Sequence, residues 1–226
     1  AATTQYRAET GEFKAVTASE AYSKASGHFK VVKPARSPED EVKANADFMA
    51  KHLKPFGWEY IVVDLAWYAP HAHKDSYKQP GLEQLIDEHG RLIPAPNRFP
   101  SSAGGKGFKL LADYVHSLGL KFGLHIMRGI PRHAVEANKP ISGSIFTSAD
   151  AVLPEGDPNR LCPWCVDMFG VRGDSPAGEA WYRSIIQQYA AWGVDFIKAD
   201  DISFLDSYKR EVAGSAAYAA PEIAAL

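Results

Sequence analysis

The sequence lacks the features that would set it apart from ordinary globular proteins. Its 226 residues include only two cysteines, Cys162 and Cys165, which is too few for a disulfide framework in a fold of this size. It has no run of about 18 apolar residues, so no segment is expected to span a membrane. The formal net charge of -2 gives no reason to expect nucleic acid or an anionic membrane as a partner. With 46% hydrophobic and 23% charged residues, the chain is long enough to bury one sizeable core.

Motifs for metals, phosphates and thiol exchange are incomplete. The eight histidines show no H-E-x-x-H spacing, and "SSAGGKGF" lacks the residue order of a phosphate-binding loop. The stretch "CPWC" resembles a thiol-disulfide exchange site, but it lies in a segment that reads as loop rather than at a helix start. As half of a zinc site it lacks a second pair of ligands. We therefore expect no metal and no cofactor, and assign the two cysteines no chemistry.

Aromatic residues are plentiful at 12%, with five Trp and ten Tyr. Flat rings of this kind pack against the apolar faces of sugars in carbohydrate-binding proteins, which is a hint of such a ligand. The opening "AATTQYRAET" has no basic or apolar targeting region, so a targeting peptide was either removed or never included. The compartment stays open, with a periplasmic or extracellular location among the alternatives.

The chain divides into an irregular N-terminal segment, residues 1–36, and an organised domain, residues 37–226. The domain repeats a helix followed by a strand three times. In the first unit Ser37 and Pro38 begin a helix, and the strand in "WEYIVVDLAWY" ends at Asp64. The second unit is "GFKLLADYVHSLG" with "LKFGLHIM", and the third is "SPAGEAWYRSIIQQYAAWG" with "VDFIKADD". Three such units predict an α/β fold with a parallel sheet.

Polar residues follow each predicted strand. The connections from strand to helix are long, and functional sites of parallel α/β folds lie beyond the carboxyl ends of strands. Five residues lie at these strand ends: Asp64, His125, Arg128, Lys198 and Asp200. The alternative is that each strand simply ends and its charged residues reach solvent. That alternative gives no reason for three separate strands to place polar residues at the same rim.

The pair Lys198 and Asp200 has a specific chemical use. Residues two apart on a strand face the same side, so these two point together, while Asp201 points elsewhere. A neighbouring positive charge lowers the pKa of a carboxylate and keeps it ionised, which is the form that attacks an anomeric carbon. Asp200 is therefore the candidate nucleophile.

Four stretches carry a family resemblance: "GWEYIVVDLAWY", "GRLIPAPNRFPSSAGGKGFKLLADYVHSLGLKFGLHIMRG", "CPWCVDMFGV" and "WGVDFIKADD". Their order and spacing resemble the α-galactosidases of glycoside hydrolase family 27, particularly the bacterial members. The resemblance implies a (β/α)8 barrel, of which this chain is the first half, and hydrolysis of terminal α-D-galactosides with retention of configuration through two aspartates.

The resemblance also implies roles for individual residues. The family carries a Lys-x-Asp motif at a strand end, which Lys198 and Asp200 match, and this match implies that Asp200 is the nucleophile. Asp64 and His125 match residues that bind the sugar in the family. Further substrate-binding residues are expected at Trp67, Arg128 and Trp164.

The sequence departs from the family pattern in three places. The usual Gly-Trp-Asn-Ser-Trp stretch is missing, Leu65 stands where many relatives have a second Asp, and the acid/base aspartate lies beyond Leu226. We therefore expect the isolated chain to be inactive, and its partners to be an α-galactoside, the second half of the barrel or another copy. Alternatives are a non-catalytic truncated barrel that binds sugar or protein, an α-N-acetylgalactosaminidase and a β-L-arabinopyranosidase.

Overall fold

A computed structural model describes residues 2–7, 12–17, 37–73, 80–157, 160–162, 165–200 and 225. The predicted site residue Trp164 lies outside the described residues. The chain separates into two compact units, Ala1–Arg36 and Ser37–Leu226.

In the first unit, residues expected to be irregular form two paired strands. Strands β1 (Ala2–Arg7) and β2 (Glu12–Thr17) run antiparallel, with Tyr6 opposite Phe13. The difference has a sequence basis, because the charged Glu12 and Lys14 alternate with Phe13 and Ala15 at the period of a strand.

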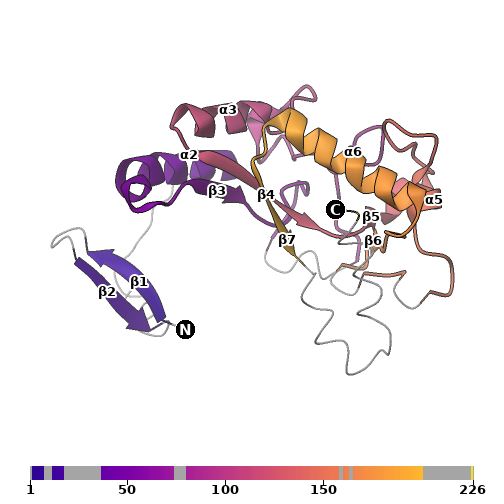
Figure 1. Cartoon of the computed structure of the whole chain (residues 1–226), viewed down its shortest axis with the longest axis horizontal. Helices are drawn as coiled ribbons and strands as arrows, with labels where there is room; N and C mark the ends of the chain where they lie inside the picture. Colours follow the sequence, from indigo (N-terminus) through magenta and orange to yellow (C-terminus); the bar gives the residue numbers. More distant parts are fainter. Residues whose placement is uncertain are drawn as a thin grey trace. The chain divides into compact units, whose positions relative to one another are not determined.

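The second unit is built on a three-stranded parallel sheet, as predicted. Its strands are β3 (Tyr60–Val63), β4 (Lys121–Met127) and β7 (Phe196–Asp200), in the order β3-β4-β7. Helices α3 (Lys109–Ser117) and α6 (Pro176–Trp192) lie on the same side of this sheet (Figure 1). On that side, β3 and β4 contribute the buried apolar residues Ile61, Phe122 and Leu124, and β7 contributes the partly buried Ile197.

Helix α2 (Pro38–Phe48) begins at the predicted residue. The Ser37 hydroxyl accepts a hydrogen bond from the Asp40 N–H, and the Asp40 carboxylate accepts one from the Ser37 N–H, which forms a capping box. The helix continues as the π-helical segment η1 (Met49–Leu53) and the 3-10 turn η2 (Lys54–Phe56), and ends at Gly57 with φ 88°. A residue without Cβ adopts this left-handed conformation readily, so the chain turns there toward β3.

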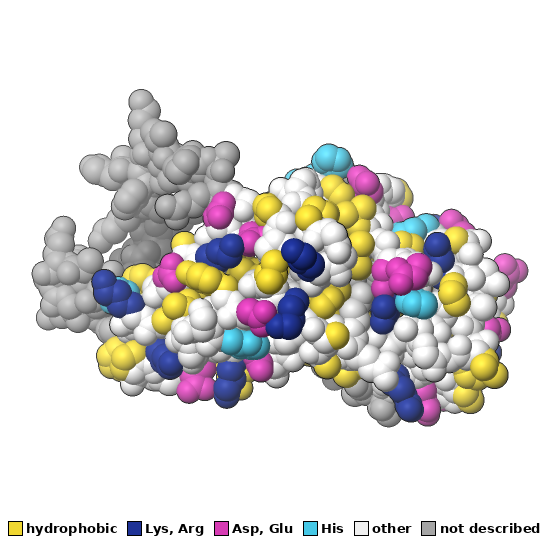
Figure 2. Space-filling model, turned by 90° about the horizontal axis from the view of Figure 1, so that it is seen from above, with side chains coloured by type: hydrophobic (Ala, Val, Ile, Leu, Met, Phe, Trp, Pro, Cys, Tyr) yellow, Lys and Arg dark blue, Asp and Glu magenta, His cyan; other side chains and the backbone are white. Residues whose placement is uncertain are grey.

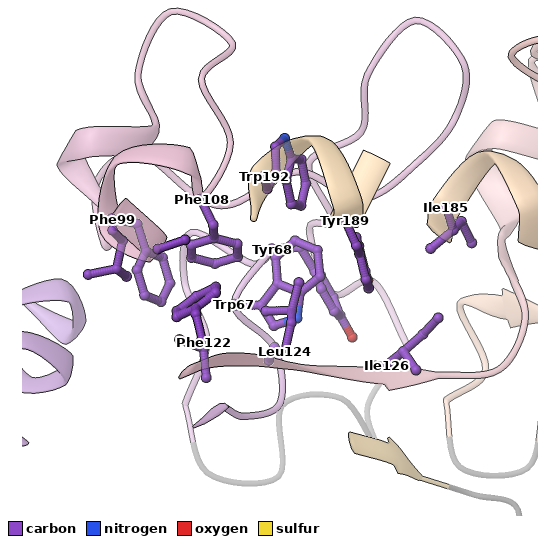
Figure 3. Close-up of a cluster of buried hydrophobic side chains, with 14 of the residues drawn as sticks. Trp67, Tyr68, Phe99, Phe108, Phe122, Leu124, Ile126, Ile185, Tyr189 and Trp192 are labelled. Atoms are coloured by element: carbon purple, nitrogen blue, oxygen red, sulfur yellow. The ribbon is translucent and has the colours of Figure 1, made fainter. Parts of the chain in front are cut away.

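Helices α3 (Lys109–Ser117) and α6 (Pro176–Trp192) present the predicted apolar stripes to the sheet. α6 begins at its N-cap Ser175, whose hydroxyl accepts from the Gly178 N–H at 3.0 Å. The helices and the loop after β3 enclose an aromatic core (Figure 3), whose residues are Trp67, Tyr68, Phe99, Phe108, Phe122, Tyr189 and Trp192. This core fixes the position of the sheet relative to its helices.

Where they are described, the long connections after β3 and β4 contain short elements. These are η4 (Pro100–Ser102), β5 (Ile130–Pro131), α4 (Arg132–Glu136), α5 (Ser148–Ala151) and β6 (Met168–Phe169). Strands β5 and β6 pair antiparallel, so part of the loop after β4 is ordered on itself. Within the described residues, every helix is too short or too polar to cross a membrane. Figure 2 shows acidic and basic side chains interspersed on the face it displays.

Candidate functional site at the strand ends

The register of the parallel sheet brings three predicted residues to one level. Val63 pairs with Leu124, and Leu124 with Ile197. The residues that follow these three are Asp64, His125 and Lys198. His125 and Lys198 are themselves register partners. The prediction that these residues share the carboxyl rim of the sheet agrees with this geometry.

Lys198 reaches across the central strand to Asp64. Its Nζ atom lies 3.1 Å from Oδ1 and 3.0 Å from Oδ2 of Asp64. Because β4 separates β3 from β7 and neighbouring strands are about 4.8 Å apart, only a long side chain can span this distance. His125 lies beneath the pair, with Nε2 3.8 Å from Asp64 Oδ1.

The site is open on one side and closed on the other. The side chain of Asp64 is 61% exposed and that of Lys198 is 40% exposed, whereas His125 is 2% exposed. Burial raises the pKa of Asp64, but hydrogen bonds from the Leu65 N–H and from Lys198, and the charges of His125 and Lys198, outweigh it and hold the pKa below its usual value. The rim thus presents an ionised carboxylate and an ammonium group to a ligand.

Asp200 is the last residue of β7 and pairs with Met127 in the register. It follows Lys198 by two positions, so the strand period places both positions on one face. Lys198 also contacts Asp64 on another strand, a pairing that local sequence reasoning did not predict.

Trp67 was predicted to bind substrate, and the structure contradicts this role. It is 1% exposed, and its ring contacts those of Tyr68, Phe108 and Trp192 at centroid distances of 5.3, 5.4 and 6.2 Å. Its Nε1 donates to the backbone oxygen of His125 at 3.0 Å. The physical reason is the turn at Ala66, whose φ of 58° folds the chain back so that the indole enters the core. Trp67 therefore supports β4 through its hydrogen bond to the backbone of His125.

Arg98 holds this turn in place, and sequence reasoning missed it. Its Nη1 donates to the backbone oxygens of Ala66 and, at 3.1 Å, of Ala69. Nearby, Asn97 Nδ2 donates to Pro70 O at 2.9 Å. The only available signal was their place in the family-like stretch "IPAPNRF", because hydrogen bonds to backbone oxygens leave no periodic pattern.

Arg128 lies just beyond β4 and is buried, with Nη1 3.9 Å from the Cys162 sulfur. Cys162 and Cys165 are both buried and reduced, next to Met168. Burial raises the pKa of the Cys165 thiol to about 11, so the thiolate needed for disulfide exchange is disfavoured. Among the residues that the structure describes, no group of three or more His, Cys, Asp or Glu side chains could hold a metal ion.

Comparison with known proteins identifies relatives of this chain. The family model described as Alpha galactosidase A matches residues 36–137. Alpha-galactosidase 3 of Arabidopsis thaliana is 30% identical over 70% of this chain and 32% of its own length. The chain therefore corresponds to about a third of that relative.

Solved bacterial structures are more similar. A candidate alpha-N-acetylgalactosaminidase of Bacillus halodurans is 45% identical with a TM-score of 0.70, over 83% of this chain and 41% of that one. A β-L-arabinopyranosidase of Geobacillus stearothermophilus is 51% identical with a TM-score of 0.66, over 76% of this chain and 41% of that one. These matches confirm the predicted fold class, a partial (β/α)8 barrel. Together with the parallel sheet and its strand-end motifs, they show that the chain is similar to members of glycoside hydrolase family 27.

Proposed function

We propose that this chain supplies the nucleophile half of a retaining glycoside hydrolase that acts on terminal α-D-galactosides or closely related sugars. The observation that carries the proposal is the cluster of Asp64, His125 and Lys198 at one level of the sheet, followed on the same strand by Asp200. Residues 37–226 form the catalytic part in this proposal.

In the first step, a carboxylate oxygen of Asp200 attacks the anomeric carbon and displaces the leaving-group oxygen. A second carboxylic acid, outside the described residues, protonates that oxygen, so a glycosyl-enzyme ester and a free alcohol result. Water then cleaves the ester, with the second carboxylate acting as base, and configuration is retained. Such a mechanism requires the two carboxyl groups to be about 5–5.5 Å apart.

The other rim residues bind and orient the sugar. The Asp64 carboxylate accepts hydrogen bonds from sugar hydroxyls, and its low pKa keeps it ionised for this purpose. Lys198 holds Asp64 in place and adds positive charge beside the nucleophile, which favours the ionised form of Asp200. His125 supports the floor of the site, and Arg128 and Trp164 remain predicted substrate-binding residues.

The choice of sugar is the finer part of the proposal. The named relatives include alpha-galactosidases, alpha-N-acetylgalactosaminidases and a β-L-arabinopyranosidase. These three sugars share the configuration of their ring hydroxyls and differ at the substituents on C2 and C5. An Asp64-type carboxylate that binds the shared hydroxyls therefore serves all three.

The proposal is tested with the full-length protein that carries this chain. The measurement is turnover of the nitrophenyl α-galactoside, α-N-acetylgalactosaminide and β-L-arabinopyranoside. We expect hydrolysis of at least one substrate, a loss of several orders of magnitude in kcat for Asp200→Asn, and a smaller loss for Lys198→Met. Asp113→Asn is the control, because Asp113 lies on α3 and its ion pair within the described residues is with the exposed Lys109. Turnover of the Asp200→Asn protein at the unsubstituted rate would overturn the proposal and favour a non-catalytic sugar-binding role.

A further inference from the structure

A cleft of about 750 Å³ lies beside α6, separate from the strand-end cluster. Its walls are the C-terminal part of α6, from Gln187 to Trp192, and the loop 86–107 that leads into α3. None of the three described rim residues lines it. Its volume falls within the range of about 300–1,000 Å³ that is typical of small-molecule sites.

The cleft contains a buried polar group whose partner is missing. Gln188 is 8% exposed, and its Nε2 donates to Asp87 Oδ2 at 3.3 Å. This contact fixes the orientation of the amide, because the opposite orientation would place an oxygen against a carboxylate. The Oε1 atom of Gln188 is buried and has no hydrogen-bond partner among the described residues. Buried amide oxygens are normally paired, so this atom is an unsatisfied polar group within the wall of the cleft.

The surrounding polar groups are rigidly held. Arg91 approaches Asp87 Oδ2 with both Nε and Nη2, each at 2.8 Å. Its Nη1 donates to the backbone oxygen of Ser184 on α6 at 3.1 Å. The carboxylate that orients Gln188 is therefore fixed between the loop and the helix, so Gln188 is preorganised for binding.

Trp192 contributes an aromatic surface and a donor. It is 7% exposed and stacks on Tyr189 with a centroid distance of 5.6 Å. Figure 3 shows its indole nitrogen on the side of the ring that points away from the aromatic core. Gly107 packs closely against this ring, since an added Cβ would lie 2.0 Å from Nε1. The glycine keeps the indole seated in the wall of the cleft.

A smaller hollow of about 170 Å³ continues the cleft along α6. The two share Ser142 and Gln187, and the second is also lined by Glu179 and Arg183. The two hollows together form an elongated groove whose charged side chains carry both signs. We call it the α6 groove.

We propose that the α6 groove binds a neutral oligosaccharide at a site separate from the strand ends. A sugar hydroxyl can accept from the Trp192 indole, whereas an anion would meet the carboxylates of Asp87 and Glu88. The elongated shape fits more than one sugar ring. This inference does not rest on catalysis at Asp200, so either proposal can fail while the other stands.

The test is calorimetric binding of raffinose to a variant whose strand-end site is disabled by Asp64→Ala. In that background we compare Ala191→Trp with Ala190→Trp, because both alanines are exposed on α6 but only Ala191 lines the groove. We expect raffinose to bind the Asp64→Ala protein, to bind at least about tenfold more weakly after Ala191→Trp, and to be unaffected by Ala190→Trp.

The same pair of substitutions is measured in a Lys198→Met background, and circular dichroism melting confirms that each variant is folded. Absence of raffinose binding in the folded single variants would overturn the proposal. Equal binding to the Ala191→Trp and Ala190→Trp proteins would also overturn it, because the sugar would then bind elsewhere.

Discussion

Replacing Trp67 by Phe should destabilise the fold without a specific effect on sugar binding. The change removes part of an indole that is 1% exposed and wedged among aromatic rings, which costs about 1–2 kcal/mol by comparison with about 3–5 kcal/mol for complete Trp→Ala truncations. It also removes the donor to the His125 backbone oxygen, worth about 1 kcal/mol. We therefore expect the free energy of unfolding to fall by about 2–3 kcal/mol, and Tm by about 4–12 °C.

Urea unfolding followed by circular dichroism measures this change, with the midpoint expected to fall at a constant slope. The matched control is Trp58→Phe, because Trp58 is 63% exposed and its truncation should change stability by less than about 0.5 kcal/mol. An unchanged midpoint for Trp67→Phe, together with weakened sugar binding, would refute the core assignment and restore Trp67 as a substrate-binding residue.

Two further stability predictions concern packing and pH. Gly107→Ala should destabilise the fold, because the new Cβ would overlap the Trp192 ring and because Gly107 has φ 56°. Thermal melting should show a lower Tm, and an unchanged Tm would contradict this prediction. Asp195→Ala should cost about 1–2 kcal/mol after discounting for partial exposure, since this carboxylate accepts from Phe122 N–H at 2.8 Å and from His116 Nε2 at 2.7 Å. Burial raises the pKa of Asp195, but these contacts lower it overall, so its contribution is present above its unfolded pKa of about 3.9 and is lost as the pH falls further. Urea midpoints from pH 7 to pH 3 should therefore converge for the two proteins, and a constant difference would refute the linkage.

The fold of residues 37–200 was largely predictable because its local signals agree. Ser37 and Ser175 cap helices that begin with Pro, and Gly57 and Gly193 close helical segments in left-handed conformations. The apolar stripes then place each helix on the sheet. Parallel strands bring their carboxyl ends to one rim, so the joint location of Asp64, His125 and Lys198 followed from the strand assignments alone.

What could not be predicted depends on tertiary contacts that leave no periodic pattern. Trp67 follows a strand end closely enough to resemble a site residue, and only the left-handed turn at Ala66 shows that its side chain enters the core. Arg98 acts on backbone oxygens 29 and 32 residues away in the chain, which no local motif encodes. The contact of Lys198 with Asp64 likewise crosses the sheet from one strand to another, which no local motif encodes.

The central claim, that Asp200 attacks the anomeric carbon, is tested most directly by azide rescue of the Asp200→Gly full-length protein on an activated α-galactoside. Glycine leaves room for azide, which replaces the missing carboxylate as nucleophile. The account predicts turnover that is lost without azide, restored with it, and yields the β-galactosyl azide, because azide attacks the face opposite the leaving group. Turnover near the unsubstituted rate without azide, or formation of the α-galactosyl azide, would show that Asp200 is not the nucleophile.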